Sequence, residues 1–312
     1  MSLMRNLLLW GSRNQWMLKN IPRMHFVQSA LKRFMPGESM EDALSAARIF
    51  QNENIPTVFT YLGENITNLS EASQVTSHYL NLVDKISERN LDIEVSLKLT
   101  QIGLDLSFEK AIENFKRITS KALEKNNVVW VDMEASNYVD TAIRFYKKVK
   151  EEYSNAGLCI QAYLFRTEKD LEDLLSGNCR TPVIRLVKGA YKEPADIAFK
   201  EKRKVDENYL ELAKMLLQSV KDNSARAAFG THDINLVKQI EDAGKGLNIP
   251  KDKIEFQMLY GIKTNEQKRL AREGYNLRVL ISYGKAWFPW YMRRLAERPA
   301  NVVFVLKNLF TN

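Results

Sequence analysis

Short apolar runs recur at regular intervals from about residue 55 onward, and amphipathic stretches fill the intervals. Several runs are rich in β-branched residues, which favours strands. The intervals carry apolar residues at helical spacing, as in 107–125 and 206–223, and Ser107 stands where a helix N-cap is expected. The predicted strands are 57–64, 92–99, 128–134, 157–164, 183–189, 226–233, 253–260 and 277–284.

Alternation of strands and helices predicts parallel strands joined by right-handed crossovers. Eight such repeats favour a closed (βα)8 barrel of the TIM type over an open sheet. The glycine-rich and Walker phosphate-binding signatures of open sheets are absent from the chain. We therefore predict an α/β protein with an N-terminal helical arm, residues 1–50, followed by one barrel domain, residues 51–312.

The arm is basic and apolar. Residues 1–37 contain six lysines and arginines and no acidic residue, together with Trp10, Trp16 and several leucines. Three interpretations stay open: a helical arm packed on the barrel, a helix lying on an anionic membrane surface, and a mitochondrial transit peptide.

The composition restricts the class of protein further. The chain has 312 residues, 45% of them hydrophobic, and a net charge of +8, which is ordinary for a globular protein. Both signs of charge are mixed outside the arm, so nucleic-acid binding is not expected. No apolar run is long enough to span a bilayer. Two cysteines, Cys159 and Cys179, and three histidines predict neither a disulfide framework nor a metal site, and weakly favour a reducing, cytoplasmic compartment.

Polar side chains stand at the ends of the predicted strands, where the active site of such a barrel lies. Together they suggest chemistry, although each has a structural alternative. Lys98 could form an ion pair with Asp132 or Glu134, and His232 could be a buried, hydrogen-bonded histidine. The residues in question are Glu64, Lys98, Asp132, Glu134, Gln161, Tyr163, Arg185, Lys188, Thr231, His232, Gln257 and Tyr260.

Two adjacent arginines, Arg293 and Arg294, lie on a predicted helix after a cluster of aromatic residues. An ion pair between Arg293 and Glu297 at i,i+4 is the structural alternative, but Arg294 and Arg298 at the same spacing repel each other. A helix that presents two guanidiniums to a carboxylate or phosphate explains the pattern better, because the planar fork binds such anions bidentately.

Seven motifs occur in an order and at a spacing that resemble one family: "VSLKLTQIGLD", "VDMEAS", "QAYLFRT", "RLVKGAY", "THD", "EFQMLYG" and "RRLAERPANV". They resemble proline dehydrogenases, in particular the short monofunctional type of Bacillus-like bacteria, over essentially the whole barrel. The resemblance implies a distorted (βα)8 barrel that binds FAD and oxidises L-proline to Δ1-pyrroline-5-carboxylate.

The resemblance also implies that electrons pass to a membrane quinone. It places the enzyme at the inner face of the cell membrane, or in mitochondria if the source is eukaryotic, with a downstream pyrroline-5-carboxylate dehydrogenase as a partner. No residue stands out as a covalent flavin attachment point, so we expect non-covalent FAD.

Matching motifs imply roles for individual residues. Arg293 and Arg294 resemble the pair that binds the proline carboxylate, Lys98 resembles a third cation, Glu297 the residue that orients the arginines, and Asp132 the carboxylate that holds the lysine. Arg185 resembles the residue beside flavin N5. The remaining matches are Ala190, Tyr191 and Leu259 in the substrate pocket, and Gln161, Val187, Lys188, Gly189, Thr231 and His232 at the cofactor.

Two substrate-pocket positions depart from the family pattern, because Leu280 and Trp290 stand where tyrosines are usual. A dehydrogenase preferring 4-hydroxyproline or another cyclic amino acid is therefore an alternative. Two more alternatives stay open: a Schiff-base lyase that uses Lys98 as nucleophile, and a non-catalytic, membrane-associated barrel.

Overall fold

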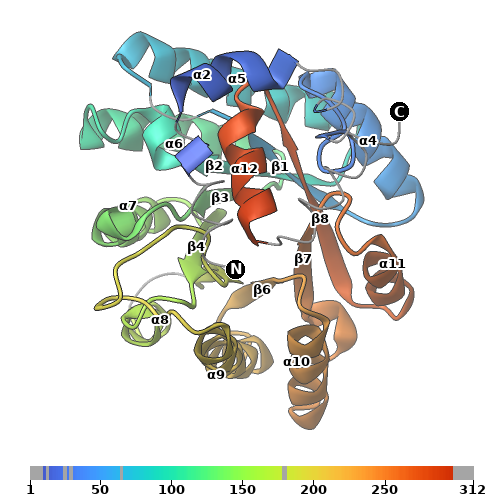
Figure 1. The fold of residues 1–312 in the computed structure, drawn as a ribbon. Helices are drawn as coiled ribbons and strands as arrows, with labels where there is room; N and C mark the ends of the chain where they lie inside the picture. The colour runs from blue at the N-terminus through green and yellow to red at the C-terminus, as the bar shows by residue number, and fades with distance from the viewer. Residues whose placement is uncertain are drawn as a thin grey trace.

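Eight parallel strands close into a barrel in chain order, which confirms the predicted (βα)8 architecture (Figure 1). The computed structural model describes residues 10–11, 14–23, 27, 31–63, 66–177 and 181–297. All eight apolar runs form strands. Their bounds are β1 (Thr57–Tyr61), β2 (Ile93–Lys98), β3 (Val129–Asp132), β4 (Ala156–Gln161), β5 (Val183–Val187), β6 (Arg226–Gly230), β7 (Glu255–Leu259) and β8 (Asn276–Tyr283).

A ring of helices covers the outside of the strands (Figure 1). Each helix packs its apolar face against the strands. The expected cap at Ser107 is present, since its side chain accepts a hydrogen bond from the Lys110 amide at 3.3 Å. These helices are α5 (Leu69–Glu88), α6 (Phe108–Glu124), α7 (Val139–Lys150), α8 (Thr167–Leu175), α9 (Lys202–Lys221), α10 (Ile234–Gly246) and α11 (Thr264–Arg272). Short 3-10 helices are Ile21–Arg23, Leu99–Ile102, Ser136–Tyr138 and Lys251–Lys253.

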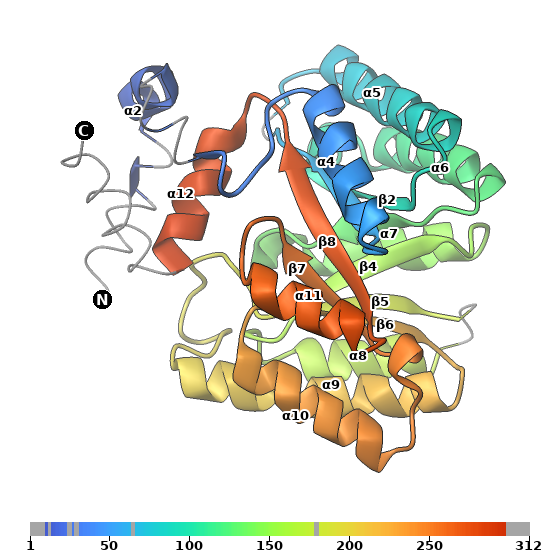
Figure 2. The same ribbon diagram turned by 90° about the vertical axis from the view of Figure 1, so that its right-hand side faces the viewer.

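The ring is completed by a helix that precedes the first strand. Helix α4 (Met40–Asn52) starts at a capping box between Ser39 and Asp42 and packs on β1 and β8. Because α4 occupies this place, the helix that follows β8, α12 (Trp287–Glu297), lies across the C-terminal ends of the strands instead (Figures 1 and 2). The predicted domain boundary at residue 50 falls inside α4, and the division into two domains stays a prediction.

The described part of the N-terminal region is helical, as predicted, and lies beside α12 (Figure 2). It contains α2 (Gln15–Asn20), and Val27, Leu31 and Phe34 share one apolar group with α12. Among the residues that the structure describes, no helix is both long and apolar enough to cross a membrane.

Candidate active site

Arg185 is the most deeply buried cation of the candidate site, with 2% of its surface exposed inside the barrel. Its Nη2 atom donates to Ser96 Oγ at 2.8 Å and forms an ion pair with Asp132, and its Nη1 atom donates to Gln257 Oε1 at 3.1 Å. Burial opposes the charge, but Asp132 together with Cys159 and Glu94 outweighs the burial and raises the pKa of Arg185. Arg185 therefore stays a cation in a nearly dry interior.

Strand alternation places four polar groups above Arg185, at the C-terminal end of the barrel. Lys98 ends β2 directly opposite Asp132 on β3 and is buried. Gln161 ends β4 and donates through Nε2 to the Glu134 carbonyl at 3.1 Å. Ser282 lies near the end of β8. Among the described residues, Gln161 Oε1 and Ser282 Oγ are buried without a hydrogen-bond partner.

The Asp132 carboxylate accepts a hydrogen bond from the Ser96 hydroxyl at 2.9 Å and forms an ion pair with Arg185. From the family resemblance, Asp132 was predicted to hold Lys98. The structure brings the two residues together as register partners, and it adds Arg185 as an ion-pair partner of the carboxylate.

The last residue of β5 and the segment that follows it carry five predicted site residues, 187–191, and the segment is anchored by a buried carboxylate. Glu193 accepts hydrogen bonds from the Ser136 amide at 2.9 Å and from the Tyr163 hydroxyl at 3.2 Å. Gly189 adopts a φ of 111°, and a Cβ there would lie 2.4 Å from the Tyr163 ring. Only glycine fits this place without displacing the ring.

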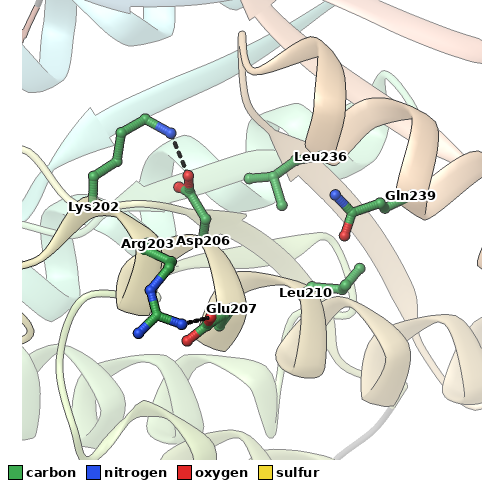
Figure 3. Close-up of a pocket in the computed structure, with 7 residues that line it drawn as sticks. All are labelled: Lys202, Arg203, Asp206, Glu207, Leu210, Leu236 and Gln239. Carbon is green, nitrogen blue, oxygen red and sulfur yellow. Dashed lines mark hydrogen bonds and ion pairs between the residues drawn. The ribbon is translucent and has the colours of Figure 1, made fainter.

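Lys188 belongs to a group of four charged side chains at the start of α9 and α10. It forms ion pairs with Asp206 and with Asp233, and Lys202 contacts the same two carboxylates. Burial alone would raise the pKa of Asp233, but Lys202 and Lys188 hold it well below its usual range. Lys202 and Asp206 also border a surface hollow of about 320 Å³ between α9 and α10 (Figure 3).

Thr231 and His232 follow β6 and link it to its neighbours. The Thr231 hydroxyl accepts from the Asp233 amide at 3.1 Å, and His232 Nε2 accepts from the Leu259 amide at 2.8 Å. An accepting Nε2 leaves the proton of the neutral ring on Nδ1. His232 is therefore a hydrogen-bonded histidine, as in the structural alternative to a cofactor role. The same bond holds the backbone of Leu259, a predicted pocket residue.

Helix α12 brings the arginine pair to the mouth of the barrel. The Arg293 guanidinium lies 5.9 Å from the centre of the Tyr191 ring, so the helix meets the segment after β5. Trp290 packs in the apolar group that α12 shares with the N-terminal region. Glu297 is the last described residue of the helix, and its side chain lies outside the described part, as do Glu64 and Cys179.

Leu280 lies one layer below the mouth. Its side chain packs against an apolar group inside the barrel that contains Val58, Trp130, Val183 and Ala228. It is the register partner of Leu259 on β7. The structure thus places Leu280 and Trp290 in two different apolar groups, although the sequence analysis assigned both to one pocket.

Several polar residues of the site were absent from the predicted set, namely Ser96, Glu193 and Ser282. A signal for one of them exists in β2, where Glu94, Ser96 and Lys98 alternate with apolar residues and so share one face. The contacts of Glu193 depend on how two loops meet, which the local pattern does not contain.

Comparison with known proteins agrees with this geometry. A family model described as proline dehydrogenase matches residues 43–307. Proline dehydrogenase 1 of Bacillus subtilis subsp. natto is 38% identical over 307 residues, which cover 98% of this chain and 99% of that protein. Proline dehydrogenase of Deinococcus radiodurans is 33% identical over 283 residues, 89% of each chain.

A solved structure shares the fold. The crystal structure of proline utilization A (PutA) from Bdellovibrio bacteriovorus inactivated by N-propargylglycine matches with a TM-score of 0.79 and 26% identity. The match covers 86% of this chain and 32% of that one, so this chain spans about a third of the PutA chain. Family model, relatives and fold agree with the resemblance seen in the motifs, and the chain belongs to the proline dehydrogenase family.

Proposed function

We propose that this protein oxidises L-proline to Δ1-pyrroline-5-carboxylate with non-covalently bound FAD as the hydride acceptor. The observation that carries the proposal is the position of α12, the helix of Arg293 and Arg294, across the C-terminal ends of the strands, with the Arg293 guanidinium 5.9 Å from the centre of the Tyr191 ring. Members of the family that this chain matches nearly end to end are named for the same reaction.

The residues at the barrel end fit a flavin. A flavin ring presents hydrogen-bond donors and acceptors along one edge, and the buried Gln161 Oε1 and Ser282 Oγ are polar atoms that no described protein group satisfies. Burial of such atoms is unfavourable unless a ligand or water binds them. Val187, Lys188 and Gly189 on one side, and Thr231 and His232 on the other, belong to neighbouring strand ends and would hold the cofactor with Gln161 and Arg185.

Bound FAD would supply the two-electron oxidant, which no side chain of the site can replace. The protein's own contribution is charge and orientation. Arg185, kept cationic by Asp132, would face the flavin from the barrel interior. A fixed cation there favours the reduced state, which carries more negative charge than the oxidised one.

The substrate side is cationic. Arg293, Arg294 and Lys98 would bind the proline carboxylate, Glu297 would orient the arginines, and Ala190, Tyr191 and Leu259 would surround the ring. Binding of the carboxylate by a planar fork fixes the carbon that loses hydride relative to the cofactor, and such orientation is a large part of enzymatic rate enhancement.

The electron acceptor is proposed to be a membrane quinone, and the protein is proposed to lie at the inner face of the cell membrane. Trp10 and Trp16 in the N-terminal region expose 59% and 64% of their surfaces, and tryptophan favours membrane interfaces. The product is an imine that a separate pyrroline-5-carboxylate dehydrogenase would consume.

A second substrate is favoured by one observation. Leu280 is shorter than the tyrosine usual at this place and lies in the barrel interior next to Trp130. A wider pocket at that edge suits a ring-substituted analogue such as 4-hydroxyproline.

The test begins with the purified protein. We expect a flavin absorbance spectrum that L-proline bleaches in the absence of oxygen, and free FAD in the filtrate after denaturation. Colour that stays with the polypeptide would contradict non-covalent binding. If the protein is colourless and borohydride links the substrate covalently to Lys98, the protein is a Schiff-base lyase and the proposal is wrong.

A further inference from the structure

A chain of buried hydrogen bonds runs from Arg185 toward the N-terminal end of the barrel. Arg185 Nη1 donates to Gln257 Oε1 at 3.1 Å, and Gln257 Nε2 donates to Glu255 Oε1 at 2.8 Å. Glu255 Oε2 in turn accepts from Arg226 Nε at 2.9 Å and Nη2 at 2.7 Å. Gln257 and Glu255 are both nearly fully buried.

Trp130 closes this chain into a loop. Its ring centre lies 4.9 Å from the Arg185 guanidinium carbon and 5.5 Å from that of Arg226, both within cation–π range. Its indole nitrogen donates to Glu94 Oε2 at 2.6 Å, while Glu94 Oε1 accepts from Arg226 at 2.7 Å. The barrel interior therefore contains a connected polar network beside the apolar group of Val58, Val183 and Ala228.

This network determines how the amide of Gln257 is oriented. Glu255 is a carboxylate that only accepts, so the Gln257 nitrogen must face it, and the amide oxygen must then face Arg185. On the other side of the guanidinium, Ser96 and Asp132 both bind the same atom, Nη2. These bonds and the Trp130 ring hold the Nη2 atom and one face of the planar group. The bond from Nη1 to Gln257 supplies a second point and fixes the plane.

We propose that Gln257, oriented by Glu255, is a positioning residue that holds the Arg185 guanidinium toward the bound flavin and thereby raises the flavin's reduction potential. The inference rests on the proposed function and assigns a role to a residue whose side chain bonds to Arg185 and Glu255. Arg185 is the charged group that acts, and Gln257 acts through it.

The experiment measures the two-electron reduction potential of the flavin in the purified holoenzyme, by dye equilibration, for wild type and Gln257→Met. Methionine keeps the length of the side chain and removes both the acceptor and the donor. We expect the equilibrium constant for flavin reduction to fall about tenfold, which corresponds to about 30 mV for a two-electron couple. The matched control is Gln267→Met, a buried glutamine on α11 that donates to the carbonyls of Leu259 and Ile262. It should leave the potential unchanged.

A double variant tests whether the effect passes through Arg185. In an Arg185→Met background, Gln257→Met should shift the potential little further, because coupled residues are not additive. An equal shift in both backgrounds, or no shift in either, overturns the inference. If Gln257→Met does not fold, Gln257→Asn withdraws the amide by one methylene and should lower the potential in the same direction; a wild-type potential there overturns the inference as well. A wild-type protein without flavin would instead contradict the proposed function itself.

Discussion

The Arg293 guanidinium carbon lies 5.9 Å from the centre of the Tyr191 ring, and this contact joins α12 to the segment that follows β5. Both elements lie at the C-terminal end of the barrel, one from each side of the mouth (Figure 1). Neither belongs to the ring of helices. Helix α12 packs against the N-terminal region, and the segment after β5 is held by the hydrogen bonds of Glu193. The proposed substrate side of the site thus depends on α12 and on the segment after β5, which lie outside the ring of helices.

Replacement of the Tyr191 ring should weaken substrate binding. A cation–π contact at a partly exposed site contributes about 0.5–1 kcal/mol. We expect Tyr191→Leu to raise KM for proline about two- to fivefold, whereas Tyr191→Phe keeps the ring and should stay close to wild type. Steady-state kinetics with proline measure both. If the phenylalanine variant is as impaired as the leucine variant, the hydroxyl rather than the ring matters.

Removal of one arginine of the pair should impair binding and turnover together. Truncating one partner of a buried charge pair has an effect of about 2–5 kcal/mol, part of which is the penalty for the unpaired carboxylate. We expect Arg294→Ala to reduce kcat/KM for proline accordingly, with flavin content near wild type. Arg272→Ala, on the exposed face of α11, is the control. A wild-type kcat/KM in Arg294→Ala would show that the carboxylate binds elsewhere.

A side chain at residue 189 should disturb the segment that carries the predicted cofactor residues. Gly189 has a φ of 111°, and an added Cβ would lie 2.4 Å from the Tyr163 ring. Strain of this kind amounts to about 1–3 kcal/mol, so Gly189→Ala should lower both the midpoint of thermal unfolding and the flavin content. The control is Gly246→Ala at the end of α10, where nothing lies within 4 Å of the new Cβ. Equal flavin content in the two variants would contradict the assignment of Gly189.

The folded protein should become less stable as the pH decreases, because His78 is buried in its neutral form. Its Nε2 lies 2.8 Å from the Tyr283 hydroxyl and its ring stacks on Tyr61, and burial lowers the pKa of His78 below its ordinary value. Because the pKa of His78 is lower in the folded protein, the unfolded chain binds more protons as the pH decreases. The contribution of His78 to stability is therefore full above about pH 6.5 and is lost as the pH falls through the folded pKa.

The measurement is urea unfolding of wild type and His78→Gln at pH 8 and pH 5. Burial raises the pKa of the neighbouring Tyr79 and Tyr283, so both stay neutral over this range. The difference in the free energy of unfolding between the two proteins should therefore be smaller at pH 5. A difference that is constant, or larger at pH 5, would show that His78 does not carry the effect.

Leu280→Tyr should increase the preference for unsubstituted proline over 4-hydroxyproline. A single altered apolar contact changes discrimination by about 1–3 kcal/mol, or 10- to 200-fold. Because Leu280 and Trp290 pack in different apolar groups, the effects of Leu280→Tyr and Trp290→Tyr should add. The ratio of kcat/KM for the two substrates, measured in the four proteins of the cycle, tests this. If Leu280→Tyr leaves this ratio unchanged in both the wild-type and the Trp290→Tyr background, Leu280 does not line the substrate pocket.

The local pattern of the chain determined the eight strands and their order, because strand periodicity, turn residues and helix caps act over a few residues. Ser107 caps its helix as predicted. The alternation of Glu94, Ser96 and Lys98 with apolar residues is a local signal for the polar face of β2 that the predicted set did not use. The motifs likewise led to the family, since they preserve residue type and spacing within single strand ends.

Tertiary structure alone decided which distant residues meet. Gln257 and Arg185 are 72 positions apart, and they bond only because the sheet closes and brings β5 and β7 to one interior. The place of α12 was equally beyond the local pattern: its sequence predicts a helix, but only the packing of α4 against β8 and β1 leaves it across the mouth. Local propensity acts along the chain, whereas closure and competition for one surface depend on the whole fold.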